Sequence, residues 1–358
     1  MTIPVSILTG FLGAGKTTLL NRLLSEPTLA DSMVIINEFG EIGLDHLIVA
    51  APAENTVLLR NGCLCCTVRG ELTETLVDLA RRRVEGTLPP FARVIVETTG
   101  LADPVPILQS LLGDDELAPA YRVGRVVTVV DAVNGAQQLS ASFEAQKQAA
   151  VADRIVLSKT DLTDESQTTA LERELRALNP TASVVRAIHG GNVSASLLDS
   201  AGDEAAAGRV SRLGPMRFRT GTEESRHADV RTFTLCWDRP ARRQGLLTWL
   251  HMLASFRGPD LLRVKGIVNI DGRPVLVNAV QRLVHDPVTL DAWPSDDQSS
   301  RVVFITRRIE RAAIEPTLAA LGYMPPVGSV KLDPDRYAAF VDLANAFYAS
   351  RQEVDEQK

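Results

Sequence analysis

Short apolar runs alternate with amphipathic stretches along the first half of the chain. Runs rich in β-branched residues and bounded by turn residues are typical of buried strands. On this pattern we expect strands at Pro4–Leu8, Met33–Ile36, Thr56–Leu59, Arg93–Glu97, Arg125–Val130, Arg154–Ser158 and Ser183–Ala187. Helical spacing separates these runs, as over residues 69–84, where the apolar positions are Leu72, Leu76, Leu79 and Ala80. Such alternation predicts an α/β domain with a mainly parallel sheet that helices cover on both faces.

The second half of the chain follows a different pattern. Residues 195–229 are polar, rich in glycine and alanine and without a clear period, which predicts a linker. Beyond it, Phe233, Leu235 and Trp237 alternate with polar residues, as in a half-buried strand. A helix, three strands and a final helix are expected next, at 246–253, 261–270, 274–280, 301–305 and 311–321.

This pattern predicts three parts: an α/β domain over 1–194, the linker over 195–229 and a smaller α+β domain over 230–350. Lys and Arg number 38 against 44 Asp and Glu, which gives a formal charge of −6, so we expect no nucleic-acid partner. No apolar run is long enough to cross a bilayer, and the N-terminus lacks the basic region of a signal peptide. We therefore expect a cytoplasmic protein without a membrane partner.

The stretch GFLGAGKTT, Gly10 to Thr18, follows the first expected strand and matches the phosphate-loop pattern G-x-x-x-x-G-K-[ST]. Glycines let backbone N–H groups turn toward phosphate oxygens, and the following helix directs its positive end at the anion. A chance glycine-rich turn is the alternative, but a strand before and a helix after are the required context. We expect Lys16 to reach the β- and γ-phosphates and Thr17 to bind Mg²⁺. The predicted nucleotide-binding residues here are Gly10, Gly13, Ala14, Gly15, Lys16, Thr17 and Thr18.

The stretch SKTD, Ser158 to Asp161, ends a later strand and points to the base of the nucleotide. An aspartate there accepts hydrogen bonds from the N1–H and exocyclic amine of guanine, whereas adenine has no such pair of donors on that edge. The stem of Lys159 is long enough to lie over the base. Alone, K-x-D is usually a solvated loop, but after a phosphate loop it favours GTP.

The stretch VIVETTG, Val94 to Gly100, supplies a third part of the expected site. A strand here ends in the carboxylate of Glu97, which we expect to contact Mg²⁺ directly or through water, while the N–H of Gly100 senses the γ-phosphate. A helix-capping role for Glu97 is the alternative. The predicted catalytic residues are Lys16, Thr17 and Glu97.

Three cysteines, Cys63, Cys65 and Cys66, lie within four residues in the stretch NGCLCC. Their thiolates are soft ligands that suit Zn²⁺ or a similar metal, and they need a fourth ligand from elsewhere. The following helix and nearby Arg69 favour the thiolate form. Structural cysteines and a redox switch are the alternatives. Cys236 stands alone in a strand, and we expect it in the core.

The stretch INEFGEIGLD, Ile36 to Asp45, follows the second expected strand, where GTPases carry their first mobile switch. Glu38 and Glu41 are candidates for an oxygen ligand to the metal or for a place near Mg²⁺. Two exposed loop acids are the alternative.

Taken together, these stretches resemble the CobW-type metallochaperone GTPases, relatives of the HypB and UreG nickel-insertion GTPases. The resemblance is carried by GFLGAGKTTLL, INEFGEIGLD, NGCLCCTVRGEL, VIVETTGLADP, VVDAV, SKTDL and, later, LLRVKGIVNIDG. It implies slow GTP hydrolysis coupled to delivery of zinc, or in some branches cobalt or iron, to a client metalloprotein. By similarity Cys63, Cys65 and Cys66 bind the metal, with Glu38 as an added ligand. The chain departs from the family at Ser158, where Asn or Thr is usual, and it has no His-rich stretch.

The sequence thus favours a P-loop GTPase domain that acts as a GTP-driven metallochaperone with GTP, Mg²⁺ and Zn²⁺ as its ligands. Two alternatives remain at this stage: a small-molecule P-loop kinase, and a zinc or redox sensor that binds nucleotide without significant turnover. The client and any homo-oligomer are left open.

Overall fold

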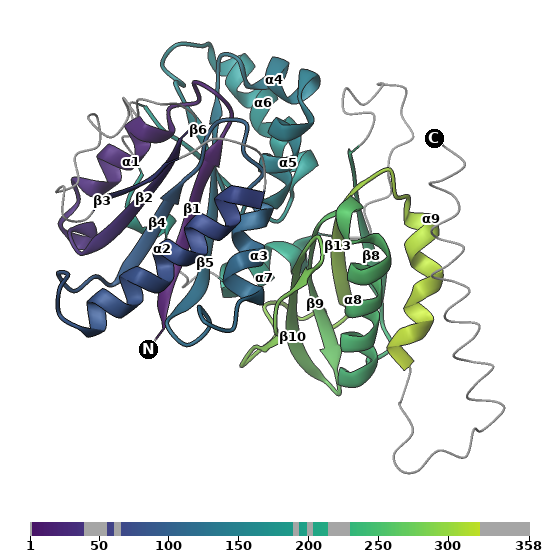
Figure 1. Cartoon of the computed structure of the whole chain (residues 1–358). Helices are drawn as coiled ribbons and strands as arrows, with labels where there is room; N and C mark the ends of the chain where they lie inside the picture. Colours follow the sequence, from purple (N-terminus) through teal and green to yellow (C-terminus); the bar gives the residue numbers. More distant parts are fainter. Residues whose placement is uncertain are drawn as a thin grey trace. The chain divides into compact units, whose positions relative to one another are not determined.

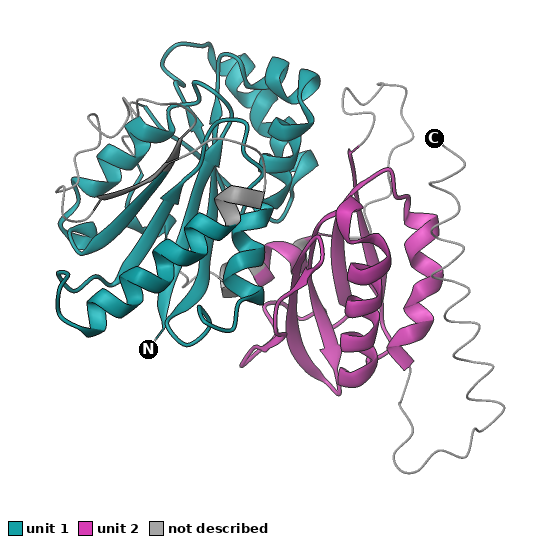
Figure 2. Cartoon of the chain, in the orientation of Figure 1, with its two compact units in different colours: residues 1–201 teal, residues 202–358 magenta. Residues whose placement is uncertain are grey.

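The structure is a computed structural model that describes residues 2–38, 56–60, 66–188, 193–198, 203–213 and 230–322. Within these ranges, the description does not extend to the side chains of 37, 38, 56–60, 66–69, 203–206 and 212. The chain forms two compact units, residues 1–201 and 202–358 (Figure 2). Each unit is treated by itself.

The first unit is built on a seven-stranded sheet within the described residues. The strand order is β3-β2-β4-β1-β5-β6-β7, and every neighbouring pair is parallel (Figure 1). The strands are β1 (Ile3–Gly10), β2 (Ser32–Glu38), β3 (Thr56–Arg60), β4 (Arg93–Glu97), β5 (Tyr121–Asp131), β6 (Arg154–Ser158) and β7 (Ser183–Arg186). The helices are α1 (Lys16–Leu24), α2 (Cys66–Val84), α3 (Val105–Gly113), α4 (Gly135–Ala141), α5 (Phe143–Val151) and α6 (Glu165–Leu178), with 3-10 turns η1 (Pro27–Leu29) and η4 (Ala195–Leu197). All seven strands predicted for this half are confirmed.

Helices cover both faces of this sheet. The buried face of α1 packs in one cluster with strand residues such as Val129 and Ile95. The opposite face meets α2 and α5: Thr128 Oγ1 donates a hydrogen bond to the carbonyl oxygen of Gln148 at 2.7 Å. On the same face, Tyr121 donates its hydroxyl to the carbonyl oxygen of Leu76 at 2.9 Å. Burial on both faces explains why these strands read as nearly continuous apolar runs.

The register brings four strand ends to one edge of the sheet. In the centre, β1 lies between β4 and β5, with Leu8 opposite Glu97. On the far side of β5, Asp131 stands opposite Ser158. The loops that follow these strands therefore start side by side, at the carboxyl edge where open α/β sheets bind their ligands.

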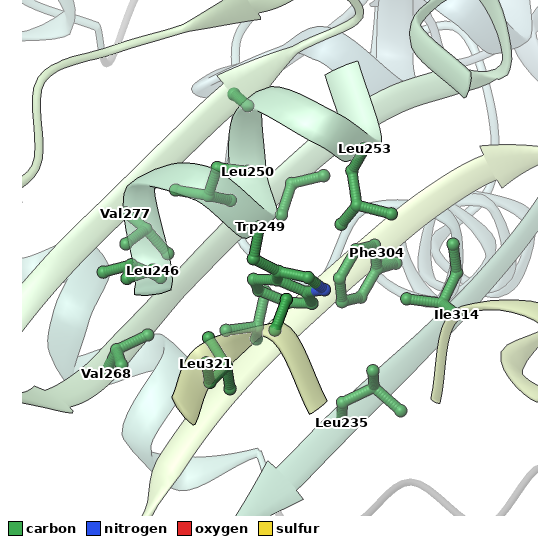
Figure 3. Close-up of a cluster of buried hydrophobic side chains, with 14 of the residues drawn as sticks. Leu235, Leu246, Trp249, Leu250, Leu253, Val268, Val277, Phe304, Ile314 and Leu321 are labelled. Atoms are coloured by element: carbon green, nitrogen blue, oxygen red, sulfur yellow. The ribbon is translucent and has the colours of Figure 1, made fainter. Parts of the chain in front are cut away.

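The second unit is an antiparallel sheet with the path β11-β10-β9-β13-β8, and β12 pairs with β10. Its strands are β8 (Val230–Trp237), β9 (Leu261–Ile270), β10 (Arg273–Val280), β11 (Leu283–Val284), β12 (Val288–Thr289) and β13 (Ser300–Arg307). Its helices are α7 (Asp203–Arg212), α8 (Arg243–Arg257) and α9 (Arg311–Ile314), with 3-10 segments η5 (Gly258–Asp260) and η6 (Glu315–Gly322). Trp249 and Phe304 lie at the centre of its apolar core (Figure 3), and Trp249 Nε1 donates to Thr317 Oγ1 at 2.8 Å.

Three expectations for this half need correction. Part of the stretch predicted as a linker is helix α7, because Ala207 and Val210 bury themselves against Ile267 and Leu276 of the sheet. The helix predicted over 311–321 is α-helical for only one turn and continues as the 3-10 segment η6, since proline at position 316 has no N–H for an α-helical bond. The third correction concerns Cys236, which is half-buried at a strand position and not in the core.

Candidate nucleotide-binding site

Three glycines shape the loop between β1 and α1. The φ angles of Gly10, Gly13 and Gly15 are 144°, 72° and 90°, all in the region that L side chains rarely adopt. At Gly10 a Cβ would also lie 2.2 Å from the carbonyl oxygen of Val129. The loop therefore requires glycine at its first position for steric and conformational reasons together.

Lys16 begins helix α1 and folds back over this loop. Its Nζ donates hydrogen bonds to the carbonyl oxygen of Gly10 at 3.0 Å and to that of Phe11 at 3.4 Å. The ammonium group thus lies at the mouth of the loop, beside the positive end of the helix. This arrangement concentrates positive charge where a phosphate group would enter.

Thr17 and Glu97 bring two oxygen donors together from opposite sides of this edge. Thr17 Oγ1 donates to Glu97 Oε1 at 2.8 Å, and Glu97 is only 4% exposed. A buried carboxylate beside a hydroxyl is a hard donor pair of the kind that Mg²⁺ prefers. The residues present therefore fit the magnesium ion that a phosphate loop implies.

The segment after β4 lies against the phosphate loop. Thr98 donates its backbone N–H to the carbonyl oxygen of Leu8 at 3.0 Å, and its Oγ1 donates to Thr9 Oγ1 at 2.8 Å. A Cβ on Gly100 would lie 2.6 Å from the backbone nitrogen and Cα of Leu12. Only glycine allows this close approach, which brings Gly100 to the loop that would hold the phosphates.

Lys159 links the loop after β6 to the phosphate loop. It adopts a φ of 56°, and its Nζ donates to the carbonyl oxygen of Gly13 at 2.7 Å and to Asp131 Oδ2 at 2.8 Å. Asp131 is 1% exposed and also accepts hydrogen bonds from the Val133 and Asn134 backbone N–H groups and from Asn134 Nδ2. Burial alone would raise the pKa of Asp131, but these hydrogen bonds and Lys159 together hold that pKa below its ordinary value.

No separate role for Asp131 was predicted, although it lies within the stretch VVDAV. Asp131 is a carboxylate at the end of a buried strand, and that strand is the neighbour of the strand that leads into K-x-D. This pattern is the sequence signal that could have identified Asp131 as a site residue. Ser158 contacts the phosphate loop directly, since its Oγ donates to the carbonyl oxygen of Ala14 at 2.6 Å. A serine at the start of this motif thus still ties the strand to the phosphate loop.

A cavity of about 210 Å³ opens beside these residues. Apolar side chains from α1, β5 and β6 form its walls, and the exposed Asp161 is one of its lining residues. A cavity with apolar walls and a carboxylate in its lining suits a planar base that carries hydrogen-bond donors. The lining residues are Gly15, Thr18, Leu19, Val129, Val156, Ser158, Lys159, Asp161, Leu162 and Ala187.

The predicted metal site falls largely outside the described residues. Cys63, Cys65 and Glu41 are not described, and the side chains of Glu38 and Cys66 are not described either, although Glu38 ends β2 and Cys66 begins α2. The remaining His, Cys, Asp and Glu side chains, those in the described ranges, form no group of three that would hold a metal ion. Where helices are described, none is long and apolar enough to cross a membrane.

Comparison with known proteins extends these observations over most of the chain. Residues 4–186 match the CobW/HypB/UreG nucleotide-binding domain, and residues 230–321 match the cobalamin synthesis protein cobW C-terminal domain. The zinc chaperone YjiA of Escherichia coli (strain K12) is 33% identical over 321 residues, which cover 89% of this chain and 98% of that protein. The zinc chaperone CobW of Sinorhizobium sp is 29% identical, with coverages of 89% and 97%. The crystal structure of Zn(II)-bound YjiA GTPase superposes with a TM-score of 0.67 at 28% identity, covering 90% of this chain and 100% of that one.

Proposed function

Since this chain belongs to the CobW/HypB/UreG family of nucleotide-binding proteins, we propose that it is a GTPase that carries zinc and delivers it to a client metalloprotein in the cytoplasm. The observation that carries the nucleotide half of this proposal is the convergence of Lys16, the Thr17–Glu97 pair and Lys159 on one phosphate loop. The names of the relatives, zinc chaperones, support the metal half.

In this proposal the triphosphate lies along the loop, and Lys16 exchanges its two backbone carbonyls for β- and γ-phosphate oxygens. The exchange is favourable because a phosphate offers a full negative charge in place of a carbonyl dipole. Thr17 and Glu97 hold Mg²⁺, which when bound neutralises charge that develops on the phosphate oxygens. Gly100 offers its N–H to the γ-phosphate from the opposite side of the loop. Ala14, Gly15 and Thr18 complete the loop around the phosphates.

The base occupies the cavity between α1 and the loop after β6. Leu19 and Val129 contact its faces, and Asp161 accepts the two guanine donors. Lys159 keeps the loop after β6 tied to Gly13, so the base site and the phosphate site act as one unit. Guanine is favoured because it presents two neighbouring donors to the carboxylate, whereas adenine has no such donor pair on that edge.

The metal ligands in this proposal are Cys63, Cys65 and Cys66, with Glu38 as the fourth. The backbone register supports this grouping, since Glu38 pairs with Arg60 at the end of β3, three residues before Cys63. The same strand β2 runs beside β4, with Ile36 opposite Glu97. The thiol segment follows β3, which is separated by the single strand β2 from β4 and its proposed Mg²⁺ ligand Glu97.

A helical connection supports coupling between the two halves. Cys66 is the first residue of α2, and α2 packs against α3. Helix α3 begins at Val105, directly after the segment that carries Gly100. The contact between Gly100 and a bound γ-phosphate therefore has a packed path through α3 to the helix that begins with one of the thiols.

Metal binding and turnover test the proposal separately. We expect Cys66→Ala to lose tight Zn²⁺ binding in a chelator competition while GTP still binds, and Cys236→Ala to behave as the wild type. Unchanged zinc affinity in Cys66→Ala would end the thiol-site assignment. We also expect the wild type to release phosphate from GTP and Lys16→Ala to release none.

A nucleotide panel separates the proposed function from its rivals. Preference for GTP over ATP, with phosphate released to water, supports the GTPase. Preference for ATP with transfer to a small acceptor would indicate a kinase, and absence of phosphate release with GTP, Mg²⁺ and Zn²⁺ would indicate a sensor.

A further inference from the structure

Helix α5 holds the segment that follows β4 through two neighbouring side chains. Gln148 is 1% exposed, and its Nε2 donates to the carbonyl oxygens of Gly100 at 3.2 Å and Ala102 at 3.0 Å. Next to it, Lys147 Nζ lies 2.5 Å from Asp103 Oδ2. Three positions of the segment, Gly100, Ala102 and Asp103, are thus held from one turn of one helix.

The opposite side of the same segment rests on the phosphate loop. Gly100 approaches the backbone of Leu12 so closely that a Cβ would collide with it. Helix α5 is in turn fixed to the sheet by the hydrogen bond from Thr128 Oγ1 to the Gln148 carbonyl oxygen. Gly100 is therefore held between a rigid helix and the loop, and its position is set by both.

The amide of Gln148 is more than a filler of space. Its Oε1 is buried and has no hydrogen-bond partner in the part of the chain that the structure describes. A buried acceptor without a donor destabilises the folded state, and a leucine would occupy the same volume without that cost. The two hydrogen bonds from Nε2 to the segment are the evident reason for an amide here.

We infer that Gln148 and Lys147 are positioning residues that set how strongly this protein distinguishes GTP from GDP. They hold Gly100 against the phosphate loop before nucleotide binds, so that its N–H meets the γ-phosphate without further ordering of the segment. GDP lacks the γ-phosphate and gains nothing from this arrangement. The inference rests on the proposed function, in which the Gly100 N–H contacts the γ-phosphate.

Helix α5 itself offers a matched control. Gln146 is a second buried glutamine, 7% exposed, and its Nε2 donates to the carbonyl oxygen of Leu139 at 2.7 Å, away from the segment after β4. Gln146→Ala and Gln148→Ala each remove one buried side-chain amide from helix α5. The two variants differ in whether the segment that carries Gly100 loses its anchor.

The test measures the affinities of GDP and of a non-hydrolysable GTP analogue, with Mg²⁺ present, for wild type, Gln148→Ala and Gln146→Ala. Removing two hydrogen bonds should lower the analogue affinity of Gln148→Ala about tenfold and leave its GDP affinity unchanged. Gln146→Ala should keep the wild-type ratio. An unchanged ratio in Gln148→Ala, or an equal fall in both variants, would overturn the inference.

A second variant guards against a folding defect at the buried position. Asp103→Asn removes the partially exposed ion pair with Lys147 and should lower the analogue affinity in the same direction, by a smaller factor. If this variant keeps the wild-type ratio while Gln148→Ala is unfolded, the inference fails. A wild type that binds neither guanine nucleotide would instead refute the proposed function, so the two failures are distinct.

Discussion

The amine of Lys159 lies 2.8 Å from Asp131 Oδ2, and this ion pair joins the ends of two neighbouring strands at the candidate nucleotide-binding site. Asp131 is almost fully buried, whereas a third of the Lys159 side chain is exposed. The buried partner therefore fixes the position of the exposed one. Lys159 in turn reaches Gly13 in the phosphate loop, so we expect Asp131 to act on a bound nucleotide through Lys159.

We predict that Asp131→Asn lowers GTP affinity about tenfold, because the salt bridge to the Lys159 ammonium becomes a weaker hydrogen bond to a neutral amide oxygen. Calorimetric titration of GTP measures the change. Asp153→Asn is the control, since the Asp153 side chain is 10% exposed and also lies beside a cation, 4.0 Å from Arg125, but directly precedes β6 and is away from the candidate site. Equal losses of affinity in both variants would show a general effect on the fold.

The pH dependence of the same ion pair follows from the lowered pKa of Asp131. A depressed carboxyl pKa stabilises the folded site above the ordinary value of 3.8, and the contribution is lost as the pH falls through the folded-state pKa. The pair is therefore intact throughout the neutral range. If the GTP affinity falls as the pH is lowered from neutral to about 3.8, protonation of Asp131 is not the cause.

We predict that Glu97→Gln slows GTP hydrolysis about a hundredfold while GDP binding without Mg²⁺ stays as in the wild type. The amide still accepts the hydrogen bond from Thr17, so the fold is kept, but its charge no longer attracts the cation. Phosphate release over a Mg²⁺ series measures the effect, and the variant should need more Mg²⁺ for half-maximal rate. An unchanged Mg²⁺ dependence would remove Glu97 from the cation site.

The fold of the first unit could be predicted almost completely from the sequence, because its strands are long apolar runs separated by clear helical spacing. Helix α7 could not, since among its described side chains the apolar contacts to the sheet come from Ala207 and Val210 alone, and it contains Gly208. Its stability comes from the sheet it covers, and that contact is not visible in the local pattern.

The candidate site was predictable where a motif is contiguous, as at Gly10–Thr18. The roles of Asp131 and Gln148 were not, because they depend on which strand ends and helix turns meet in three dimensions. Gln148 lies 48 residues from Gly100 in the chain, and only the parallel register brings them together. Local periodicity carries no information on such a pair.

We predict that Gly10→Ala destabilises the protein by more than about 3 kcal/mol, because a Cβ would lie 2.2 Å from the Val129 carbonyl oxygen in addition to the backbone strain at positive φ. Gly86→Ala is the control: Gly86 also has positive φ, 68°, but a Cβ there meets nothing within 4 Å. That variant should cost only about 1 kcal/mol. Denaturant unfolding measures both, and similar costs would show that contact with Val129 is unimportant.

We predict that Tyr121 weakens the fold at alkaline pH. Burial raises its pKa to about 12, so between the ordinary value of 10.0 and that value the unfolded chain loses the phenolic proton while the folded chain keeps it. Over this window the free energy of unfolding should therefore fall with pH in the wild type more steeply than in Tyr121→Phe. The difference between the two slopes should be about 1.4 kcal/mol per pH unit. Equal slopes would contradict the raised pKa.

We propose that guanine nucleotide and zinc bind to coupled sites in the first unit. The most direct measurement is the GTP affinity of the wild type and of Cys66→Ala, each with and without Zn²⁺. We predict that zinc tightens GTP binding about fivefold or more in the wild type and has no effect in Cys66→Ala, and by reciprocity GTP must tighten zinc binding by the same factor. Equal GTP affinities with and without zinc in the wild type would contradict the account.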